Sequence, residues 1–156
     1  MGKGVFTKTP LAKDDRLAVF GGYVMTLAEE EQLPEQIRDY AHQIDDDLVL
    51  GIKRVEDIQP VDYFNHNCSP NAGFRGQIML VAMRDVERDE EITFDYAMVL
   101  SDAGSAEPYT LNCACGSDTC RKTVTDSDWK LLELQEKYNG YFQEYLQRKI
   151  TKNKHI

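Results

Sequence analysis

Long hydrophobic runs are missing from this chain of 156 residues. No stretch approaches the ~18 consecutive apolar residues that a membrane-spanning helix needs, which argues against a membrane protein. The first ten residues, MGKGVFTKTP, also lack the apolar core of a secretory signal peptide. We therefore expect a soluble intracellular protein of the cytoplasm or the nucleus.

Basic residues are scarce relative to acidic ones. The chain has 18 Lys and Arg against 27 Asp and Glu, a formal net charge of −9. A nucleic-acid-binding surface needs a cationic face, so no direct nucleic-acid partner is expected. An acidic protein attracts a cationic partner, such as a lysine-rich peptide, over a Debye length of ~10 Å. Alternatively, the acidity only keeps the protein in solution.

Cysteine is also sparse, with four residues in the chain. In an intracellular protein these are reduced thiols or metal ligands rather than disulfides. Cys113, Cys115 and Cys120 form a Cys-x-Cys-x4-Cys cluster, and Cys68 stands apart from them. Three thiols so close in sequence suit zinc, which prefers four ligands in a tetrahedron. Reduced thiols without a metal are the alternative.

The length fits a single domain, and an apolar fraction of 42% fits a globular one. Short apolar runs separated by turns predict strands before residue 28 and over 48–99, and hence a mainly β fold. The apolar spacing over 28–43 predicts a short helix that starts near Pro34. Two further helical patterns follow in 126–156. Asp126 or Ser127 is the expected N-cap of the first, which begins at Asp128.

An aromatic group in the C-terminal part offers two interpretations. At helical spacing it predicts the buried face of a helix, whereas an exposed group would suit a partner or a substrate. Its members are Trp129, Tyr138, Tyr141, Phe142 and Tyr145.

Two motifs carry more information than the composition does. Asn65–Asn71 reads NHNCSPN, a dense polar turn around a proline, and Ile92–Tyr96 reads ITFDY. Gly2-Lys3-Gly4 lies near the start of the chain, and the cysteine cluster follows the second motif. In this order and at these separations, the motifs resemble the SET-domain family of protein-lysine methyltransferases, from Gly2 to about Arg121.

The resemblance implies a fold of several small sheets in which the two main motifs form a knot-like substructure, contrary to the usual rule against threading. It divides the chain into a SET domain (1–111) with an insert (about 24–60), a zinc-binding post-SET segment (112–125) and a C-terminal helical extension (126–156). No motif assigns a role to the extension.

The resemblance also implies S-adenosylmethionine as cofactor. It places Lys3, Gly4, Asn65, His66 and Tyr96 in the cofactor site, where an apolar cleft with a few fixed polar groups suits a zwitterionic ligand. Asn65 and His66 alone are equally compatible with a turn that satisfies local backbone groups.

For catalysis the resemblance points to Tyr96, whose hydroxyl would orient the substrate amine. Free lysine has a pKa of ~10.4, so the channel must favour the neutral amine. Phe94 corresponds to a position that limits the number of methyl groups, and a phenylalanine there permits di- or trimethylation. Tyr23 is the expected second wall of the lysine channel. An ordinary sheet tyrosine is the alternative for Tyr96, and a core side chain for Phe94.

In family members with a cysteine-rich post-SET segment, the cysteine of the NHxCxPN turn completes a zinc site. The resemblance therefore implies one structural zinc bound by Cys68, Cys113, Cys115 and Cys120. Such a site would fix the post-SET segment over the active site and couple metal binding to catalysis.

The sequence thus predicts an S-adenosylmethionine-dependent methyltransferase that acts on a lysine of a basic protein, a histone tail or another. A catalytically silent SET fold that binds other proteins is the main alternative, and a plain zinc-binding scaffold is the third.

Overall fold

Short strands make up most of the regular structure, which confirms the mainly β prediction. The computed structural model describes residues 2–38, 40–102 and 108–153. The strands are β1 (Val5–Phe6), β2 (Arg16–Val19), β3 (Tyr23–Thr26), β4 (His42–Gln43), β5 (Leu48–Gly51), β6 (Asn65–His66), β7 (Ala72–Arg75), β8 (Met79–Ala82), β9 (Glu91–Phe94), β10 (Thr110–Asn112) and β11 (Thr123–Thr125). The α-helices are α1 (Leu27–Glu30), α2 (Glu35–Arg38), α3 (Leu132–Lys137) and α4 (Glu144–Asn153).

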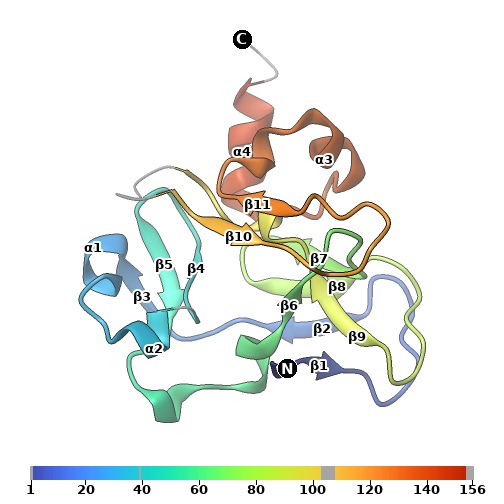
Figure 1. Cartoon of the computed structure of the whole chain (residues 1–156), viewed down its shortest axis with the longest axis horizontal. Helices are drawn as coiled ribbons and strands as arrows, with labels where there is room; N and C mark the ends of the chain where they lie inside the picture. The colour runs from blue at the N-terminus through green and yellow to red at the C-terminus, as the bar shows by residue number, and fades with distance from the viewer. Residues whose placement is uncertain (1, 39, 103–107, 154–156) are drawn as a thin grey trace.

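The strands form small sheets, with the orders β1-β9-β6, β2-β8-β7 and β3-β5-β4, and a β10-β11 hairpin. In Figure 1 the β3-β5-β4 sheet lies on one side with α1 and α2, the other two sheets lie opposite, and α3 and α4 lie beyond β10 and β11. β6 runs parallel to β9, which joins the two main sequence motifs directly. The threading of a knot stays a prediction.

The insert differs from its prediction. The helix expected over 28–43 is two four-residue helices, and the last two residues of that range form β4 instead. Thr26 caps α1 through a capping box with Glu29. Pro34 separates the helices, because proline has no amide to donate and restricts the residue before it. The second helix does start after Pro34, as expected.

The strand predicted over Ile92–Tyr96 ends at Phe94. Asp95 Oδ1 accepts a hydrogen bond from the Ala97 amide at 3.0 Å and so caps a 3₁₀ helix, Tyr96–Met98. The side-chain bond competes with continuation of the strand. Tyr96 therefore lies on a helical turn at the end of β9.

The predicted helical segment does begin at Asp128, and Ser127 occupies its N-cap position, but the helix and its cap differ from the prediction. Asp128–Lys130 form a 3₁₀ helix, and α3 begins only at Leu132. Ser127 makes no side-chain capping bond, and Asp126 Oδ2 accepts from the Tyr109 amide at 2.8 Å instead. A long-range bond has replaced the local cap.

The aromatic group of the C-terminal part is largely buried, as the first interpretation predicts, although its members come from several elements. Trp129, Tyr138, Phe142 and Tyr145 are each at most 3% exposed, and Tyr141 packs against the same core. This core also contains Phe74, Phe94 and Met98. The extension therefore packs directly against the strands that carry the motifs.

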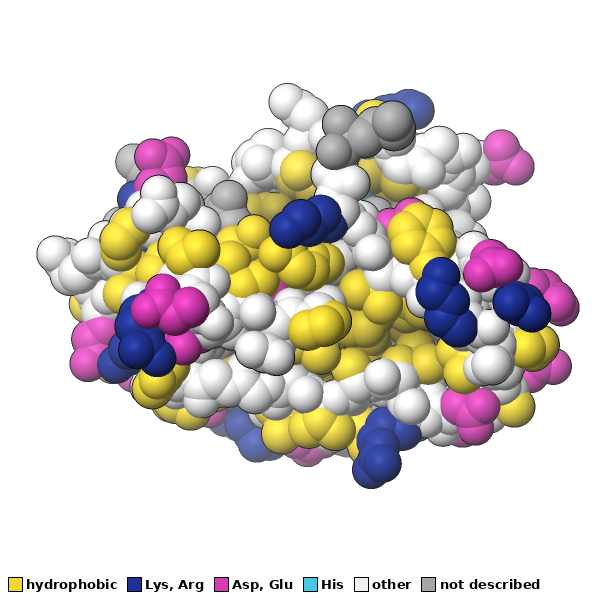
Figure 2. Space-filling view, turned by 90° about the horizontal axis from the view of Figure 1, so that it is seen from below, with side chains coloured by type: hydrophobic (Ala, Val, Ile, Leu, Met, Phe, Trp, Pro, Cys, Tyr) yellow, Lys and Arg dark blue, Asp and Glu magenta, His cyan; other side chains and the backbone are white. Residues whose placement is uncertain are grey.

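Figure 2 shows one outer face, on which hydrophobic side chains gather in the middle. Acidic side chains lie mostly toward its edges. Among the described residues, no helix has the length and apolar character to span a membrane.

Candidate active site and metal centre

A cavity of about 1220 Å³ brings the predicted site residues together. Asn65, His66, Phe94 and Tyr96 line it, and so does Gly2 from the start of the chain. The region of α1 and α2 contributes acidic side chains, and the segment after β10 contributes Cys113 and Cys115. Three parts of the chain that are distant in sequence therefore surround one space.

The parallel pairing of β6 and β9 positions the polar turn. Asn65 pairs with Thr93 and His66 with Phe94. The Asn71 side chain, 2% exposed, donates to the Glu91 carbonyl at 2.8 Å and accepts from the Thr93 amide at 2.9 Å. An asparagine that satisfies two backbone groups of a neighbouring strand fixes the register of the turn. This role of Asn71 was missed from the sequence.

Asn65 connects the turn to the start of the chain. Its Nδ2 donates to the Lys3 carbonyl at 2.9 Å and to Glu91 Oε1 at 2.7 Å. A Cβ on Gly4 would lie 2.4 Å from Glu91 Oε1 and 3.1 Å from Asn65 Nδ2, so a larger residue at this position would displace the Glu91 carboxylate from Asn65. The Lys3 ammonium lies 3.1 Å from the Tyr63 hydroxyl and is exposed. The Lys3 backbone, rather than its side chain, thus meets the site.

His66 contacts both the segment of Tyr96 and the cysteine cluster. Its Nδ1 accepts from the Tyr96 amide at 3.2 Å, and its Nε2 lies 3.3 Å from Cys68 Sγ. Burial lowers the pKa of His66, partly offset by the nearby Asp95 carboxylate. A neutral ring that accepts at Nδ1 carries its proton on Nε2, which then donates to the sulfur.

Tyr96 lies at the wall of the cavity. Its hydroxyl donates to the Phe64 carbonyl at 3.4 Å. Its ring centroid is 5.1 Å from that of His66 and 5.3 Å from that of Phe94, which is 6% exposed. Aromatic contacts on two sides restrict the rotation of the ring and fix the position of its hydroxyl.

Tyr23 lies elsewhere. It belongs to β3, is 45% exposed, and has the Lys53 ammonium 5.2 Å from its ring centroid. Among the described residues, those that line the cavity do not include Tyr23. Its role as a channel wall stays a prediction.

A buried ion pair lies directly beside Tyr96. Asp95 is fully buried, and both of its oxygens accept from Arg121, at 2.6 and 2.7 Å. Arg121 also donates to Asp128 Oδ2 at 2.9 Å, and these carboxylates raise its pKa against the effect of burial. The sequence signal for this pair was limited to the adjacency of Asp95 to Tyr96 and of Arg121 to Cys120.

His42 also lines the cavity, although no motif surrounds it. Its ring meets that of Phe20 edge-on with centroids 4.7 Å apart. Burial lowers its pKa to about 4, and its buried Nε2 has no hydrogen-bond partner within the described part of the chain. His42 is therefore neutral near pH 7.

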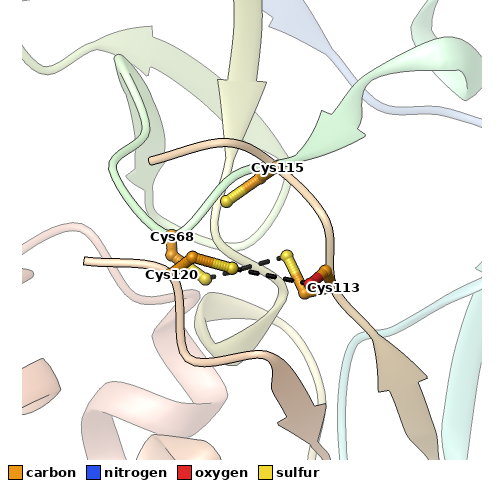
Figure 3. A group of neighbouring side chains, drawn as sticks. All are labelled: Cys68, Cys113, Cys115 and Cys120. Atoms are coloured by element: carbon orange, nitrogen blue, oxygen red, sulfur yellow. Dashed lines mark hydrogen bonds between the residues drawn. The ribbon is translucent and has the colours of Figure 1, made fainter. Parts of the chain in front are cut away.

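The four cysteines converge, as Figure 3 shows. Cys68 follows β6, Cys113 and Cys115 follow β10, and Cys120 precedes β11. The four sulfur atoms lie within 4.8 Å of one another, and Cys68 Sγ is 3.9 Å from Cys113 Sγ. Four thiolates around zinc at Zn–S distances of ~2.3 Å have sulfurs ~3.8 Å apart, so the donor set fits a tetrahedral zinc site.

The thiols differ in acidity. Burial raises the pKa of Cys113 to about 12. Burial acts on Cys115 in the same direction, but backbone hydrogen bonds from Cys68 and Ser117 outweigh it and lower its pKa to about 6. Cys115 therefore ionises more readily near neutral pH than Cys113, which would lose its proton on binding a metal.

The chain belongs to the SET domain family, whose sequence model matches residues 2–97. This match covers both main motifs and the Gly2-Lys3-Gly4 segment. The family and the fold predicted from the sequence are confirmed.

Curated relatives agree with this assignment. The chain is 29% identical to the histone-lysine N-methyltransferase ash1 of Drosophila melanogaster over 79% of the chain and 6% of that protein. It is 35% identical to the histone-lysine N-methyltransferase TRX1 of rice, Oryza sativa subsp. japonica, over 56% of the chain and 8% of that protein. It is also 27% identical to an H3 lysine-4 specific histone-lysine N-methyltransferase of Aspergillus oryzae, over 76% of the chain and 10% of that protein. The chain therefore spans a small part of each relative.

A solved structure has the same fold. The crystal structure of KRYPTONITE in complex with mCHG DNA and SAH superimposes with a TM-score of 0.55 at 19% identity, over 77% of this chain and 26% of that one. Similarity at this level of identity concerns the fold alone.

Proposed function

We propose that this chain is a protein-lysine methyltransferase that uses S-adenosylmethionine and holds one structural zinc ion. The observation that carries the proposal is the parallel pairing of β6 and β9, which brings Asn65, His66, Phe94 and Tyr96 to one cavity. Relatives named as histone-lysine methyltransferases and a fold neighbour solved with SAH support it. Within the chain, 1–111 would form the SET domain, 112–125 the zinc segment and 126–156 the extension.

The cofactor would lie against Gly2, Asn65 and His66. Gly2 lines the cavity with no atom within 4 Å of an added Cβ, which leaves room for a ligand. When bound, S-adenosylmethionine would supply a sulfonium methyl group: the neutral lysine amine would bind the methyl carbon as its bond to sulfur breaks, S-adenosylhomocysteine would leave, and the methylated nitrogen would lose one proton. Lys3 would hold Asn65 in this wall through its backbone carbonyl, which accepts from the Asn65 side chain. Gly4 would leave the space into which that side chain fits.

Tyr96 would orient the amine through its hydroxyl, and Phe94 and His42 would border the same space. Free lysine has a pKa of ~10.4, and an apolar wall favours its neutral form. Alignment of the lone pair supplies most of the gain in rate. Because Phe94 has no hydroxyl with which to hold a water molecule near the amine, the site would permit di- or trimethylation.

The zinc ligands would be Cys68, Cys113, Cys115 and Cys120. Bound zinc is structural here, since four protein ligands leave no open position. It would fix Cys113 and Cys115 at the cavity wall.

The substrate class follows from charge. Glu30, Glu31 and Glu35 line the cavity at the insert, and the chain carries a net charge of −9. A basic segment around the target lysine complements these carboxylates. Histone tails are the first candidates because of the relatives' names, and other basic proteins are the second.

Methyl transfer from radiolabelled S-adenosylmethionine tests the proposal. The zinc-loaded chain is incubated with mixed core histones and with a lysate fraction of basic proteins, and Tyr96→Phe serves as the control. Label on a protein band that the control lacks supports the enzyme. Cofactor binding without transfer to any protein favours a silent SET fold, and neither binding nor transfer contradicts the proposal.

A further inference from the structure

The C-terminal extension, which no motif explains, reaches the residues on either side of the proposed catalytic machinery. Tyr138 follows α3 and is fully buried. Its hydroxyl lies 2.9 Å from Asp95 Oδ2 and 3.1 Å from the Cys68 carbonyl. Asp95 precedes Tyr96, and Cys68 is a proposed zinc ligand. One hydroxyl therefore contacts the side chain of the residue that precedes Tyr96 and the backbone of a proposed zinc ligand.

A tyrosine hydroxyl has one proton and donates to one acceptor at a time. The charged carboxylate of Asp95 is the stronger acceptor. The Cys68 carbonyl has a second donor, the Lys137 ammonium at 2.7 Å. Tyr138 and Lys137 thus satisfy both acceptors together, from adjacent positions in the chain.

Asp95 passes this restraint to Tyr96. Arg121 donates to both oxygens of the buried carboxylate. Tyr138 adds a further donor to Oδ2. The same carboxylate accepts from the Ala97 amide and starts the turn that contains Tyr96. A shift of the carboxylate would move the backbone on both sides of Tyr96.

We propose that Tyr138 is a positioning residue for methyl transfer, and that Lys137 assists it by holding the Cys68 carbonyl. The inference rests on the proposed function and gives the extension a role in it. Tyr138 touches neither reacting group; it acts through Asp95 on Tyr96 and through Cys68 on the metal site.

A purely structural role would make Tyr138 equivalent to any other buried tyrosine of the extension. Tyr145 provides that comparison. It is 1% exposed, and its hydroxyl donates to the Val99 carbonyl at a short distance. Substitution by phenylalanine removes one buried hydroxyl and keeps the ring in both cases, so similar losses of stability are expected.

The experiment compares Tyr138→Phe with Tyr145→Phe in the zinc-loaded full chain. It measures kcat and KM for S-adenosylmethionine, and the rate at which zinc passes to a chelator. Supporting groups around a metal or catalytic residue typically change affinity or activity by about 10–100-fold. We expect Tyr138→Phe to lower kcat about tenfold with a smaller change in KM and to release zinc faster. Tyr145→Phe should match the wild type in zinc release within about twofold. It should lower kcat less than Tyr138→Phe does, because its hydroxyl binds the backbone of Val99, which follows the Tyr96–Met98 turn, rather than the carboxylate that begins this turn.

Equal kcat and equal zinc release in the two variants, at equal melting temperature, would overturn the inference. Lys137→Met is a second variant, at an exposed position where a substitution usually changes stability little. It should speed zinc release, and an unchanged rate contradicts the assistance of Lys137. If the wild type transfers no methyl group, the proposed function fails separately, and the zinc-release comparison still decides whether Tyr138 holds the Cys68 segment.

Discussion

The imidazole Nε2 of His66 lies 3.3 Å from the Sγ of Cys68. The other nitrogen of the same ring accepts from the Tyr96 amide at 3.2 Å. A residue of the proposed cofactor site therefore contacts a proposed zinc ligand directly. A change in the position of Cys68 on zinc binding or loss would therefore act on the cavity through His66.

Removal of the zinc should weaken cofactor binding. Cys120 does not line the cavity within the described chain, so Cys120→Ser acts on the site through the metal. We expect this variant to hold less than one zinc per chain and to bind S-adenosylhomocysteine several-fold more weakly by calorimetry, because Cys113 and Cys115 lose their anchor. Because the coupling is reciprocal, saturating S-adenosylhomocysteine should raise the zinc affinity of the wild type by the same factor, as measured by competition with a chelator. Unchanged affinity at reduced zinc content would separate the two sites.

Tyr96→Phe should lower kcat by about 100-fold or more, since a lost preorganised polar group commonly costs this much. The ring contacts with His66 and Phe94 remain, so the fold and the affinity for S-adenosylhomocysteine should change little. Steady-state kinetics with the identified substrate and calorimetry measure both. Full activity in the variant removes Tyr96 from the mechanism.

Gly4→Ala should weaken cofactor binding by displacing Asn65. The added Cβ would lie 2.4 Å from Glu91 Oε1 and 3.1 Å from Asn65 Nδ2, so the polar pair must shift. Gly21→Ala is the matched control, because nothing lies within 4 Å of its Cβ. We expect a several-fold loss of affinity for S-adenosylhomocysteine in the first variant and none in the second. Equal affinities would mean that the Asn65 contact does not shape the site.

His42 should make the protein sensitive to acid. Its pKa is lowered from 6.5 to about 4 by burial, so the unfolded state binds the proton first as the pH falls. Stability is therefore lost between pH 6.5 and about 4, by at most about 3 kcal/mol from this group.

The His42→Phe variant isolates this contribution, since phenylalanine keeps an aromatic contact with Phe20 and cannot be protonated. Denaturant unfolding at several pH values should show the wild type losing stability relative to the variant over that window. Zinc loss affects both proteins and cancels in the difference. A difference that stays constant with pH would contradict the buried neutral state of His42.

Short-range patterns predicted much of this molecule. The NHNCSPN turn and the ITFDY run indicated the importance of the β6–β9 region, because each motif lies in a few consecutive residues. The spacing of Cys113, Cys115 and Cys120 likewise indicated that their thiols lie close together. The resemblance to a family supplied the pairing of Cys68 with the distant cysteines. The strand end at Phe94 was missed because the Asp95 side chain competes with the backbone for an amide.

Contacts between distant segments had no such signal. The Asp95–Arg121 pair joins residues 26 positions apart, and the bond of the Tyr138 hydroxyl to Asp95 joins residues 43 positions apart. Only the folded chain brings these residues together. His42 likewise reaches the cavity through β4, where a helix was expected. The hydrogen-bond partners of these polar groups depend on tertiary packing, which the periodicity of hydrophobic residues in the sequence does not encode.

The most direct test of the central claim is mass spectrometry of the product, mapped to the residue, after incubation of the zinc-loaded chain with S-adenosylmethionine and a basic protein. We expect methyl groups on the side-chain amine of one or a few lysines, including di- or trimethylated species, and none with Tyr96→Phe. Methylation on another residue type, or equal lysine methylation by the variant, would contradict a lysine methyltransferase that works through Tyr96.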